Sequence, residues 1–386
     1  MGGEASGMEI TQKNQNRVAP NPFTPQSGWE PKVFGGREEI LSRFEAALKE
    51  AREIRPHHLV VLGNWGMGKT SLLKQFKKSA QREGFPASFC AVNRFPEKSR
   101  LEEGIALLME EILLGFPKVP EEKNLLPEKR KKLTHQPQVA LVQFLVDLWG
   151  ALRAELALVL LDDVQNFEAI PQVIDILRAA LSHEAVLEKS RYLFILATTP
   201  EGWGGFLDKH DPVGRFFRRR EPIQNLVRKE CSDLAEKTLA GSGVHFDPEV
   251  TEKLFTVTRG HPYEIQLLAS HLYDAQIEGK VTLASWEGAF ERTLRELGQD
   301  YFHSLLRRAS DRENEILRVL AEKKVPMSIA ELRHTMIFEK RKRNFPVDNI
   351  KNFLYRLETK GLVKRKDDAF TILDPMIGEF IIRISP

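Results

Sequence analysis

Cysteine is scarce in this chain, and the two residues present, Cys90 and Cys231, form no C-x-x-C pair. Isolated cysteines argue against a disulfide framework and against a zinc site. Long apolar runs are also missing, since no stretch approaches the about 20 residues of a membrane-spanning helix. The N-terminal residues lack the apolar core of a secretory signal. We therefore expect a cytoplasmic protein that has no membrane partner.

The overall composition shows no strong bias. Hydrophobic residues make up 42% of the chain and charged residues 29%, which is typical of a soluble globular protein. A length of 386 residues predicts two or three domains. Residues 1–28 begin with a stretch rich in Gly, Asn, Gln and Pro, so we predict a flexible tail there.

The net charge of +3 hides an asymmetry along the chain. Residues 301–386 contain 18 Lys and Arg against 12 Asp and Glu, a net charge of +6, whereas the remainder carries 39 against 42, a net charge of −3. An anionic polymer would therefore bind at the C-terminal part. A second basic run, EKRKK at 128–132, fits either a solvated loop or a nucleic-acid contact.

The most informative stretch is LVVLGNWGMGKTS, residues 59–71. It predicts a buried strand at Leu59–Leu62, a glycine-rich turn and a helix that begins at Lys69, which is the context of a phosphate-binding loop. Lys69 would reach the β- and γ-phosphates of ATP or ADP, and the Thr70 hydroxyl would bind Mg²⁺. A degenerate loop that binds nucleotide without hydrolysis, or binds nothing, is the alternative. The predicted nucleotide-binding residues here are Gly63, Asn64, Trp65, Gly66, Met67, Gly68, Lys69, Thr70 and Ser71.

Strands and helices alternate across the following 150 residues. Short apolar runs predict further strands at Ala87–Val92, Leu156–Leu161, Tyr192–Ala197 and Pro222–Leu226. Alternation of this kind predicts a three-layer α/β domain with a mostly parallel sheet over residues 29–227. The fold class is therefore an α/β P-loop NTPase core.

Polar residues end two of these strands. Asp162 and Asp163 follow the run at 156–161, where Asp162 would bind Mg²⁺ and Asp163 would orient or deprotonate the attacking water. Thr198 and Thr199 end the next strand, which suits a hydroxyl that senses the γ-phosphate. In both cases the alternative is an ordinary polar strand end.

Four arginines precede the last predicted strand in the stretch GRFFRRREP. A cation that neutralises charge on the γ-phosphate assists phosphoryl transfer, so Arg215 or Arg218 is a candidate arginine finger, in cis or from a neighbouring subunit. A basic surface patch is the alternative interpretation.

Beyond residue 228 the pattern becomes helical, and residues 228–300 are predicted to form a small helical domain. The stretch Arg259–Tyr263, RGHPY, sets a sharp bend before a helix whose N-terminus could face the nucleotide. A simple turn between helices is the alternative.

Residues 301–386 are predicted to form a winged-helix domain, with three helices at 312–321, 329–335 and 347–360 and a two-stranded ribbon. Basic residues occur before the last helix, on it and on the ribbon, and would contact double-stranded DNA. A winged helix that contacts protein or packs within the chain is the alternative. The candidate DNA-binding residues are Lys351, Arg356, Lys360, Lys364, Arg365 and Lys366.

These motifs occur in a fixed order: FGGREE at 34–39, GNWGMGKT at 63–70, LVLLDD at 158–163, RGHPYEIQLL at 259–268 and FTILDPMIGEFI at 370–381. With NPFTP at 21–25, they resemble the archaeal-type ATPase family, in the STAND branch of AAA+-related P-loop ATPases. Origin-recognition initiators have a similar plan.

The resemblance implies several roles. Phe34, Gly36 and Arg37 would lie near the adenine and ribose, Pro262 would pack on the adenine, and the helical domain would act as a lid. Asp163 stands where most AAA+ enzymes have glutamate, and Tyr263 where they usually have a sensor arginine, so slow, switch-like hydrolysis is expected.

Two switch functions remain open at this point, with a purely structural, nucleotide-stabilised scaffold as a third possibility. One is an ATPase switch coupled to DNA through the winged helix. The other is a signalling or defence switch whose winged helix contacts protein or nucleotide, with further copies of the chain or a separate effector protein as partners.

Overall fold

The computed structural model describes residues 19–26, 30–116, 119, 136–209, 211–339 and 346–384. The chain divides into two compact units. The first, which we call the core unit, comprises residues 25–231 and 259–265, and the second, the helical unit, comprises residues 1–24, 232–258 and 266–386.

The core unit contains a parallel sheet whose strands stand in the order β2-β3-β4-β1-β5. The central strands β3 and β4 are buried along their whole length, as a parallel sheet covered on both faces requires. The strands are β1 (Leu59–Leu62), β2 (Ala87–Ala91), β3 (Ala157–Asp162), β4 (Tyr192–Thr198) and β5 (Arg219–Pro222). A parallel α/β core is thus confirmed.

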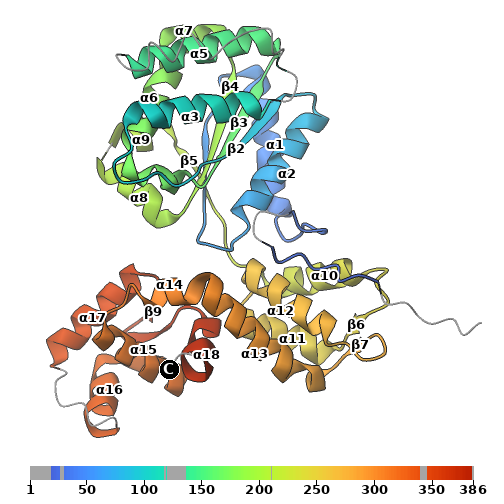
Figure 1. Ribbon diagram of the computed structural model, residues 1–386, viewed down its shortest axis with the longest axis vertical. Coiled ribbons are helices and arrows are strands. Elements are labelled where there is room, and N and C mark those ends of the chain that lie inside the picture. Colours follow the sequence, from blue (N-terminus) through green and yellow to red (C-terminus); the bar gives the residue numbers. More distant parts are fainter. Residues whose placement is uncertain are drawn as a thin grey trace, which may run out of the picture. The chain divides into compact units, whose positions relative to one another are not determined.

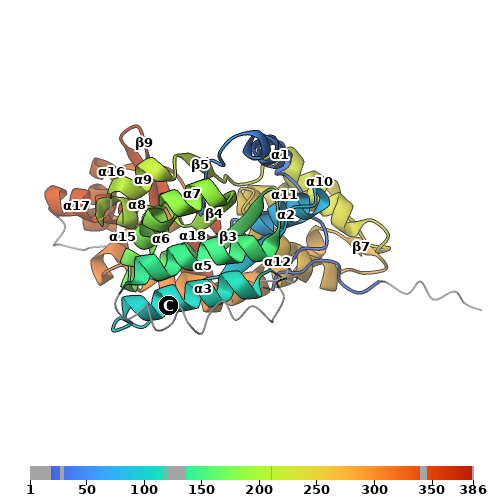
Figure 2. The same ribbon diagram turned by 90° about the horizontal axis from the view of Figure 1, so that it is seen from above.

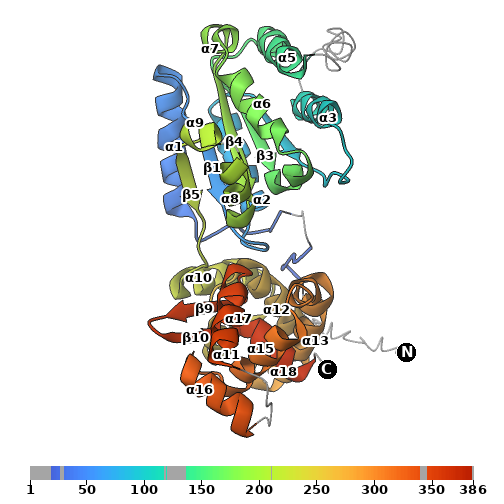
Figure 3. The ribbon, with the colours of Figure 1, turned by 90° about the vertical axis from the view of Figure 1, so that its left-hand side faces the viewer.

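Helices cover both faces of this sheet (Figure 3). On one face lie α1 (Glu38–Glu53) and α2 (Lys69–Arg82), where the Phe44 and Phe76 rings stack with centroids 3.9 Å apart. The other face is covered by α3, α5 and α6, and Figure 2 shows α3 and α5 side by side. The remaining core helices are α3 (Leu101–Leu114), α5 (Pro137–Leu152), α6 (Gln172–Leu181), α7 (Glu184–Lys189), α8 (Pro200–Lys209) and α9 (Asp211–Phe216).

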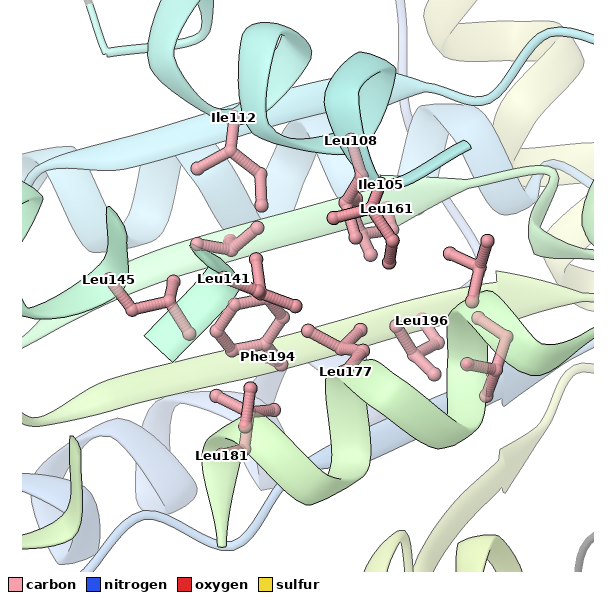
Figure 4. Packing of buried hydrophobic residues seen from close by; sticks show 14 of the residues in the cluster. Ile105, Leu108, Ile112, Leu141, Leu145, Leu161, Leu177, Leu181, Phe194 and Leu196 are labelled. Carbon is pink, nitrogen blue, oxygen red and sulfur yellow. The ribbon is translucent and has the colours of Figure 1, made fainter. Parts of the chain in front are cut away.

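Figure 4 shows the interior between the sheet and this second layer. Leucine, isoleucine and phenylalanine side chains from three helices meet the faces of β3 and β4, and they are almost completely removed from water. Burial of this kind is the main stabilising contribution to such a core. The labelled residues are Ile105, Leu108, Ile112, Leu141, Leu145, Leu161, Leu177, Leu181, Phe194 and Leu196.

The last core strand differs from the expectation. We predicted it at Pro222–Leu226, but β5 is Arg219–Pro222, because this strand lies at the sheet edge, where charged side chains reach solvent. Its charged sequence therefore concealed it. Ile223 donates only one further ladder hydrogen bond, to the Leu62 carbonyl at 2.8 Å.

The described part of the helical unit consists of short helices and two small sheets, whose strands are only two to four residues long. Its C-terminal part has the order α15-β8-α16-α17-β9-β10-α18, and Figure 1 labels its helices. The three strands form an antiparallel sheet in the order β8-β10-β9. The strand β8 was not predicted. The earlier elements are α10 (Arg228–Leu239), β6 (His245–Phe246), α11 (Pro248–Thr258), α12 (Pro262–Asp274), β7 (Lys280–Val281), α13 (Trp286–Leu297) and α14 (His303–Leu306). The later ones are α15 (Asp311–Lys323), β8 (Met327–Ser328), α16 (Ile329–His334), α17 (Val347–Thr359), β9 (Val363–Lys366), β10 (Ala369–Ile372) and α18 (Pro375–Arg383).

The final helix, α18, joins the two parts of the helical unit. Phe380 packs against Phe302 with ring centroids 5.5 Å apart, and a Cβ added at Gly298 would lie 2.4 Å from the Phe380 ring. Arg383 pairs with Glu287 of α13 at 2.9 Å. These contacts explain why residues 266–386 form one unit.

The predicted tail needs a correction at its end. Residues 19–24 pack within the helical unit, where the Asn21 amide donates to Asp274 at 2.8 Å and to the Ser270 carbonyl at 3.0 Å. Phe23 is buried and stacks on Phe246. An apolar ring and an amide with several acceptors in reach hold this segment against α12. Residues 1–18 lie outside the described residues.

Candidate functional site

The turn between β1 and α2 has the backbone of a phosphate-binding loop. Gly66 and Gly68 have φ values of 74° and 86°, a region that only glycine enters without strain. Gly68 also occupies the N-cap position of α2 and leaves the first N–H groups of the helix without a side-chain cap. Uncapped N–H groups at a helix N-terminus form an anion-binding position.

Lys69 lies folded over this loop. Its Nζ donates to the Asn64 carbonyl at 3.1 Å, and the side chain is buried. Burial lowers the pKa of Lys69, while the nearby Asp163 and Asp162 act in the opposite direction. The amine is therefore placed at the loop with two carboxylates close by.

The end of β3 meets the start of α2. Thr70 Oγ1 donates to Asp162 Oδ2 at 2.5 Å, and Asp162 Oδ1 accepts from the Asp163 N–H at 3.0 Å. Burial raises the pKa of Asp162, Asp163 raises it further, and Thr70 and Lys69 counteract this. A hydroxyl and a buried carboxylate are hard oxygen ligands, so this pair fits Mg²⁺.

Asp163 begins the 3₁₀ turn that follows β3, with a left-handed φ of 54°. Its carboxylate accepts from the Gln165 amide at 2.9 Å. A non-glycine residue in this conformation is uncommon and is held in place by its surroundings. The two neighbouring aspartates thus have different environments, one buried at the strand end and one on the turn.

The two threonines at the end of β4 also differ. Thr198 is fully buried, and its Oγ1 has no hydrogen-bond partner among the described residues. Thr199 Oγ1 accepts from the Gly202 N–H at 3.0 Å, which is a capping role in the first turn of α8. Because β4 lies between β1 and β3, Thr198 stands between the phosphate-binding loop and Asp162 along the sheet edge.

The predicted adenine-side residues precede α1. A Cβ added at Gly36, where φ is 73°, would lie 2.5 Å from Leu226 Cδ2, and Phe34 packs against the α1–α2 layer. Arg37 is only 9% exposed, and its Nη2 has no hydrogen-bond partner among the described residues. Burial lowers its pKa, and Glu230 opposes this. A buried guanidinium nitrogen of this kind fits a polar ligand.

Residues 259–265 belong to the core unit although they lie between helices of the other unit in the sequence. His261 Nε2 lies 3.1 Å from the Trp65 carbonyl, and the Tyr263 N–H donates to the Gly66 carbonyl at 3.2 Å. The Trp65 and Tyr263 rings meet edge to face, with centroids 4.5 Å apart. The sequence predicted a bend here before a helix whose N-terminus could face the nucleotide, but it did not predict these particular contacts with the loop.

The candidate arginine fingers lie at the amino-terminal ends of the parallel strands, whereas the phosphate-binding loop lies at their carboxyl ends. Arg219 pairs with Leu59 at the start of β1, whereas the phosphate-binding loop follows Leu62, a separation of about 10 Å along the strand. Arg215 and Arg218 precede Arg219, and Arg218 Nε donates to the Arg215 carbonyl at 2.9 Å. This position separates them from the phosphate-binding loop of their own chain.

The candidate DNA-binding residues fall into two groups. Lys351, Arg356, Lys364 and Lys366 have exposed side chains. Lys360 instead forms a 2.7 Å ion pair with the buried Glu313, and Arg365 pairs with Asp368 at 2.8 Å. The basic runs at residues 128–132 and 340–343 lie outside the described residues.

The sheet order and the loop between β1 and α2 define an AAA+-like P-loop NTPase fold. In agreement, residues 33–196 match a family model described as the AAA ATPase domain. A comparison with curated proteins found no match. None of the helices in the described ranges combines the length and apolar character that crossing a bilayer requires.

Two solved structures are similar over nearly the whole chain. The ORC2 protein of Aeropyrum pernix, in ADPNP–ADP complexes, gives a TM-score of 0.64 at 16% identity, covering 92% of this chain and 96% of that one. A Walker-type ATPase of Pyrococcus abyssi gives a TM-score of 0.59 at 17% identity, covering 91% and 96%. At these identities the similarity shows the fold.

Proposed function

We propose that the protein binds ATP and hydrolyses it slowly, as a switch controlled by the bound nucleotide. The observation that carries this proposal is the hydrogen bond between Thr70 and Asp162, next to the buried Lys69. It brings the loop hydroxyl and the strand-end carboxylate to one point. These are the side chains that ATP and Mg²⁺ require in a P-loop site.

Each residue then has a defined task. Lys69 binds the β- and γ-phosphates, and Thr70 and Asp162 hold Mg²⁺, which neutralises charge on the phosphates when bound. Asp163, held by Gln165, orients the attacking water. The buried Thr198 hydroxyl is directed to the γ-phosphate or the water.

On the base side, we assign Phe34, Gly36, Arg37 and Pro262 to the adenine and ribose. The buried Nη2 of Arg37 supports this assignment. Slow turnover is supported by Asp163 in place of a longer glutamate and by Tyr263 in place of a sensor arginine. Both features resemble switch-type rather than motor-type ATPases.

The test is the steady-state ATPase rate with Mg²⁺ for the wild type and Lys69→Ala. We expect the rate of the variant to be at least about 100-fold lower, because the substitution removes the positive charge that binds the phosphates. Lys77→Ala, two turns further along α2, is the matched control and should retain the rate. Equal rates for the wild type and Lys69→Ala would overturn the proposed function.

We further propose that residues 301–386 form a winged helix that contacts double-stranded DNA, with residues 228–300 as the lid domain. The exposed Lys351, Arg356 and Lys366 support this partner. Double charge reversal, Lys351→Glu with Lys366→Glu, should weaken binding to all DNA sequences and reduce the salt slope by about 2. Lys189→Glu with Lys237→Glu, two exposed lysines elsewhere, is the control of equal net charge.

The pairing of Lys360 and Arg365 with acidic residues favours a second candidate, a switch of the STAND type whose C-terminal part contacts protein. This candidate predicts no DNA affinity in the wild type. It also predicts oligomers that form with ATP and not with ADP, measured by light scattering. DNA binding by the wild type that both double variants retain equally would contradict the assigned DNA surface.

A further inference from the structure

The carbonyl edge of the phosphate-binding loop is held by a segment almost 200 residues away in sequence. Two successive carbonyls, those of Trp65 and Gly66, accept hydrogen bonds from His261 Nε2 at 3.1 Å and from the Tyr263 N–H at 3.2 Å. Because a carbonyl only accepts, Nε2 of His261 carries the proton. We call residues 259–265 the loop brace.

These two bonds fix the orientation of the loop peptides. In a planar trans peptide the N–H of the next residue points opposite to the carbonyl. Holding the carbonyls of Trp65 and Gly66 toward the brace therefore turns the N–H groups of Gly66 and Met67 to the other side of the loop. On the proposed function, on which this inference rests, that side receives the phosphates.

Gly66 supports the same conclusion. The motif G-x-x-x-x-G-K-[ST] places no requirement on this position, yet it is glycine with φ 74°. A Cβ there would lie 2.5 Å from His261 Cε1 and 2.9 Å from Tyr263 Cβ. Two features therefore exclude a side chain at this position: the left-handed backbone and the close approach of the brace.

The brace is also anchored on its opposite side, next to the end of β5. The Leu226 N–H donates to the Gly260 carbonyl at 2.8 Å, and the Asn225 amide donates to the Arg259 carbonyl at 3.0 Å. A Cβ at Gly260 would lie 1.9 Å from the Leu226 carbonyl oxygen. The brace is therefore fixed to the sheet end and can hold the loop against it.

We propose that His261 is a positioning residue for the phosphate-binding loop: with the Tyr263 N–H, it holds the loop in its phosphate-binding form before a nucleoside di- or triphosphate arrives. Binding then requires less ordering of the loop, which raises affinity. The brace contacts the loop from outside, so it acts on ADP and ATP alike and leaves the chemical step unchanged.

The test compares His261→Leu, which removes the donor, with His261→Gln, whose amide nitrogen can donate from a similar position. The probe is Mg-ADP, and Kd is measured by calorimetry on the full chain. Loss of one hydrogen bond should raise Kd about tenfold in His261→Leu, while His261→Gln remains within about twofold of the wild type. His245→Leu, an exposed histidine in the helical unit, is the matched control and should leave Kd unchanged.

Two further measurements separate positioning from general damage. In His261→Leu, amide hydrogen exchange without nucleotide should accelerate in residues 63–70 and remain unchanged in β3 and β4. At saturating Mg-ATP, kcat should be retained while KM rises. Equal Kd values for the three proteins would overturn the brace, whereas failure of the wild type to bind Mg-ADP would overturn the proposed function itself.

Discussion

Thr70 Oγ1 donates a 2.5 Å hydrogen bond to Asp162 Oδ2, although the two residues are 92 positions apart in the chain. The bond joins the first turn of α2 to the end of a buried strand. Its acceptor is a carboxylate that is only 2% exposed, and burial raises the pKa of this group. Thr70 and Lys69 therefore compensate the buried negative charge of Asp162 only in part. A bound cation would supply the remaining compensation.

The first prediction concerns this charge. In Asp162→Asn the side-chain oxygen can keep the bond from the Asp163 N–H, and the amide can donate to Thr70. Without nucleotide we expect Tm to rise by about 2 °C, because a desolvated charge is removed. ATPase activity should fall at least about 100-fold, and Mg²⁺ should no longer tighten ATP binding.

Differential scanning calorimetry and nucleotide titration with and without Mg²⁺ measure both effects. Asp208→Asn, an exposed carboxylate at the end of α8, is the control and should change neither. An Asp162→Asn protein that keeps its Mg²⁺-dependent affinity would contradict the assignment.

The second prediction concerns pH. His58 precedes β1, and its Nδ1 accepts from the Phe194 N–H at 3.1 Å. Its ring lies among Phe194, Phe216 and Phe217. Burial, with a contribution from His57, lowers the pKa of His58 to about 3. Between pH 6.5 and 3 the unfolded chain therefore binds a proton that the folded protein does not.

Stability should accordingly decrease as pH falls below 6.5. Because His58 is partly accessible to solvent, we take about 2 kcal/mol as the upper value for its contribution between pH 7 and 5. His58→Asn keeps an acceptor for the Phe194 N–H and removes the titration. Urea midpoints measured against pH should fall less steeply for this variant, and parallel profiles would contradict the prediction.

The parts of this protein that follow local patterns could be predicted from the sequence. The strand Leu59–Leu62, the loop that follows it and the carboxylates after the apolar run at 156–161 are each encoded within a few neighbouring residues. The edge strand β5 was misplaced because its exposed charged residues carry no apolar pattern. The segment 19–24 was assigned to a flexible tail because its partners Ser270 and Asp274 are about 250 residues away.

The missing parts of the site have the same cause. The contacts of His261 with Trp65 and the differing environments of Thr198 and Thr199 depend on which strand ends lie side by side. The hydrophobic periodicity of the sequence carries no information on which strand ends are neighbours. Similarly, Lys360 follows the end of α17 with the spacing of an exposed basic residue, but its partner Glu313 lies on α15.

The third prediction concerns the contribution of Lys360 to stability. Burial alone would raise the pKa of Glu313, but hydrogen bonds from Lys360 and Ser310 lower it. Lys360→Met leaves this carboxylate buried without its cation and should destabilise the protein by about 2 kcal/mol. Adding Glu313→Gln should recover most of the loss.

Urea unfolding of the two variants measures this effect. Lys351→Met is the control, because Lys351 is exposed and should cost less than about 0.5 kcal/mol. Equal stability of Lys360→Met and the wild type would show that the pair contributes nothing.

The fourth prediction concerns the arginines at the amino edge of the sheet. Arg215 and Arg218 precede β5, whose first residue lies at the opposite end of β1 from the loop after Leu62. An arginine finger among them would therefore serve a second copy of the chain. Arg218→Ala should then reduce the ATPase rate about tenfold or more and leave the Kd for ADP unchanged. The rate per chain should also rise with protein concentration in the wild type.

Mixing two impaired variants provides the decisive measurement. Lys69→Ala has no working phosphate site but keeps Arg218, whereas Arg218→Ala has the site and lacks the arginine. An equimolar mixture should regain part of the wild-type rate, because mixed assemblies combine an intact loop from one chain with Arg218 from the other. A mixture of Lys69→Ala with Asp162→Asn, which both affect the same site, should stay inactive. If the first mixture shows no more activity than its components, Arg218 does not act between subunits.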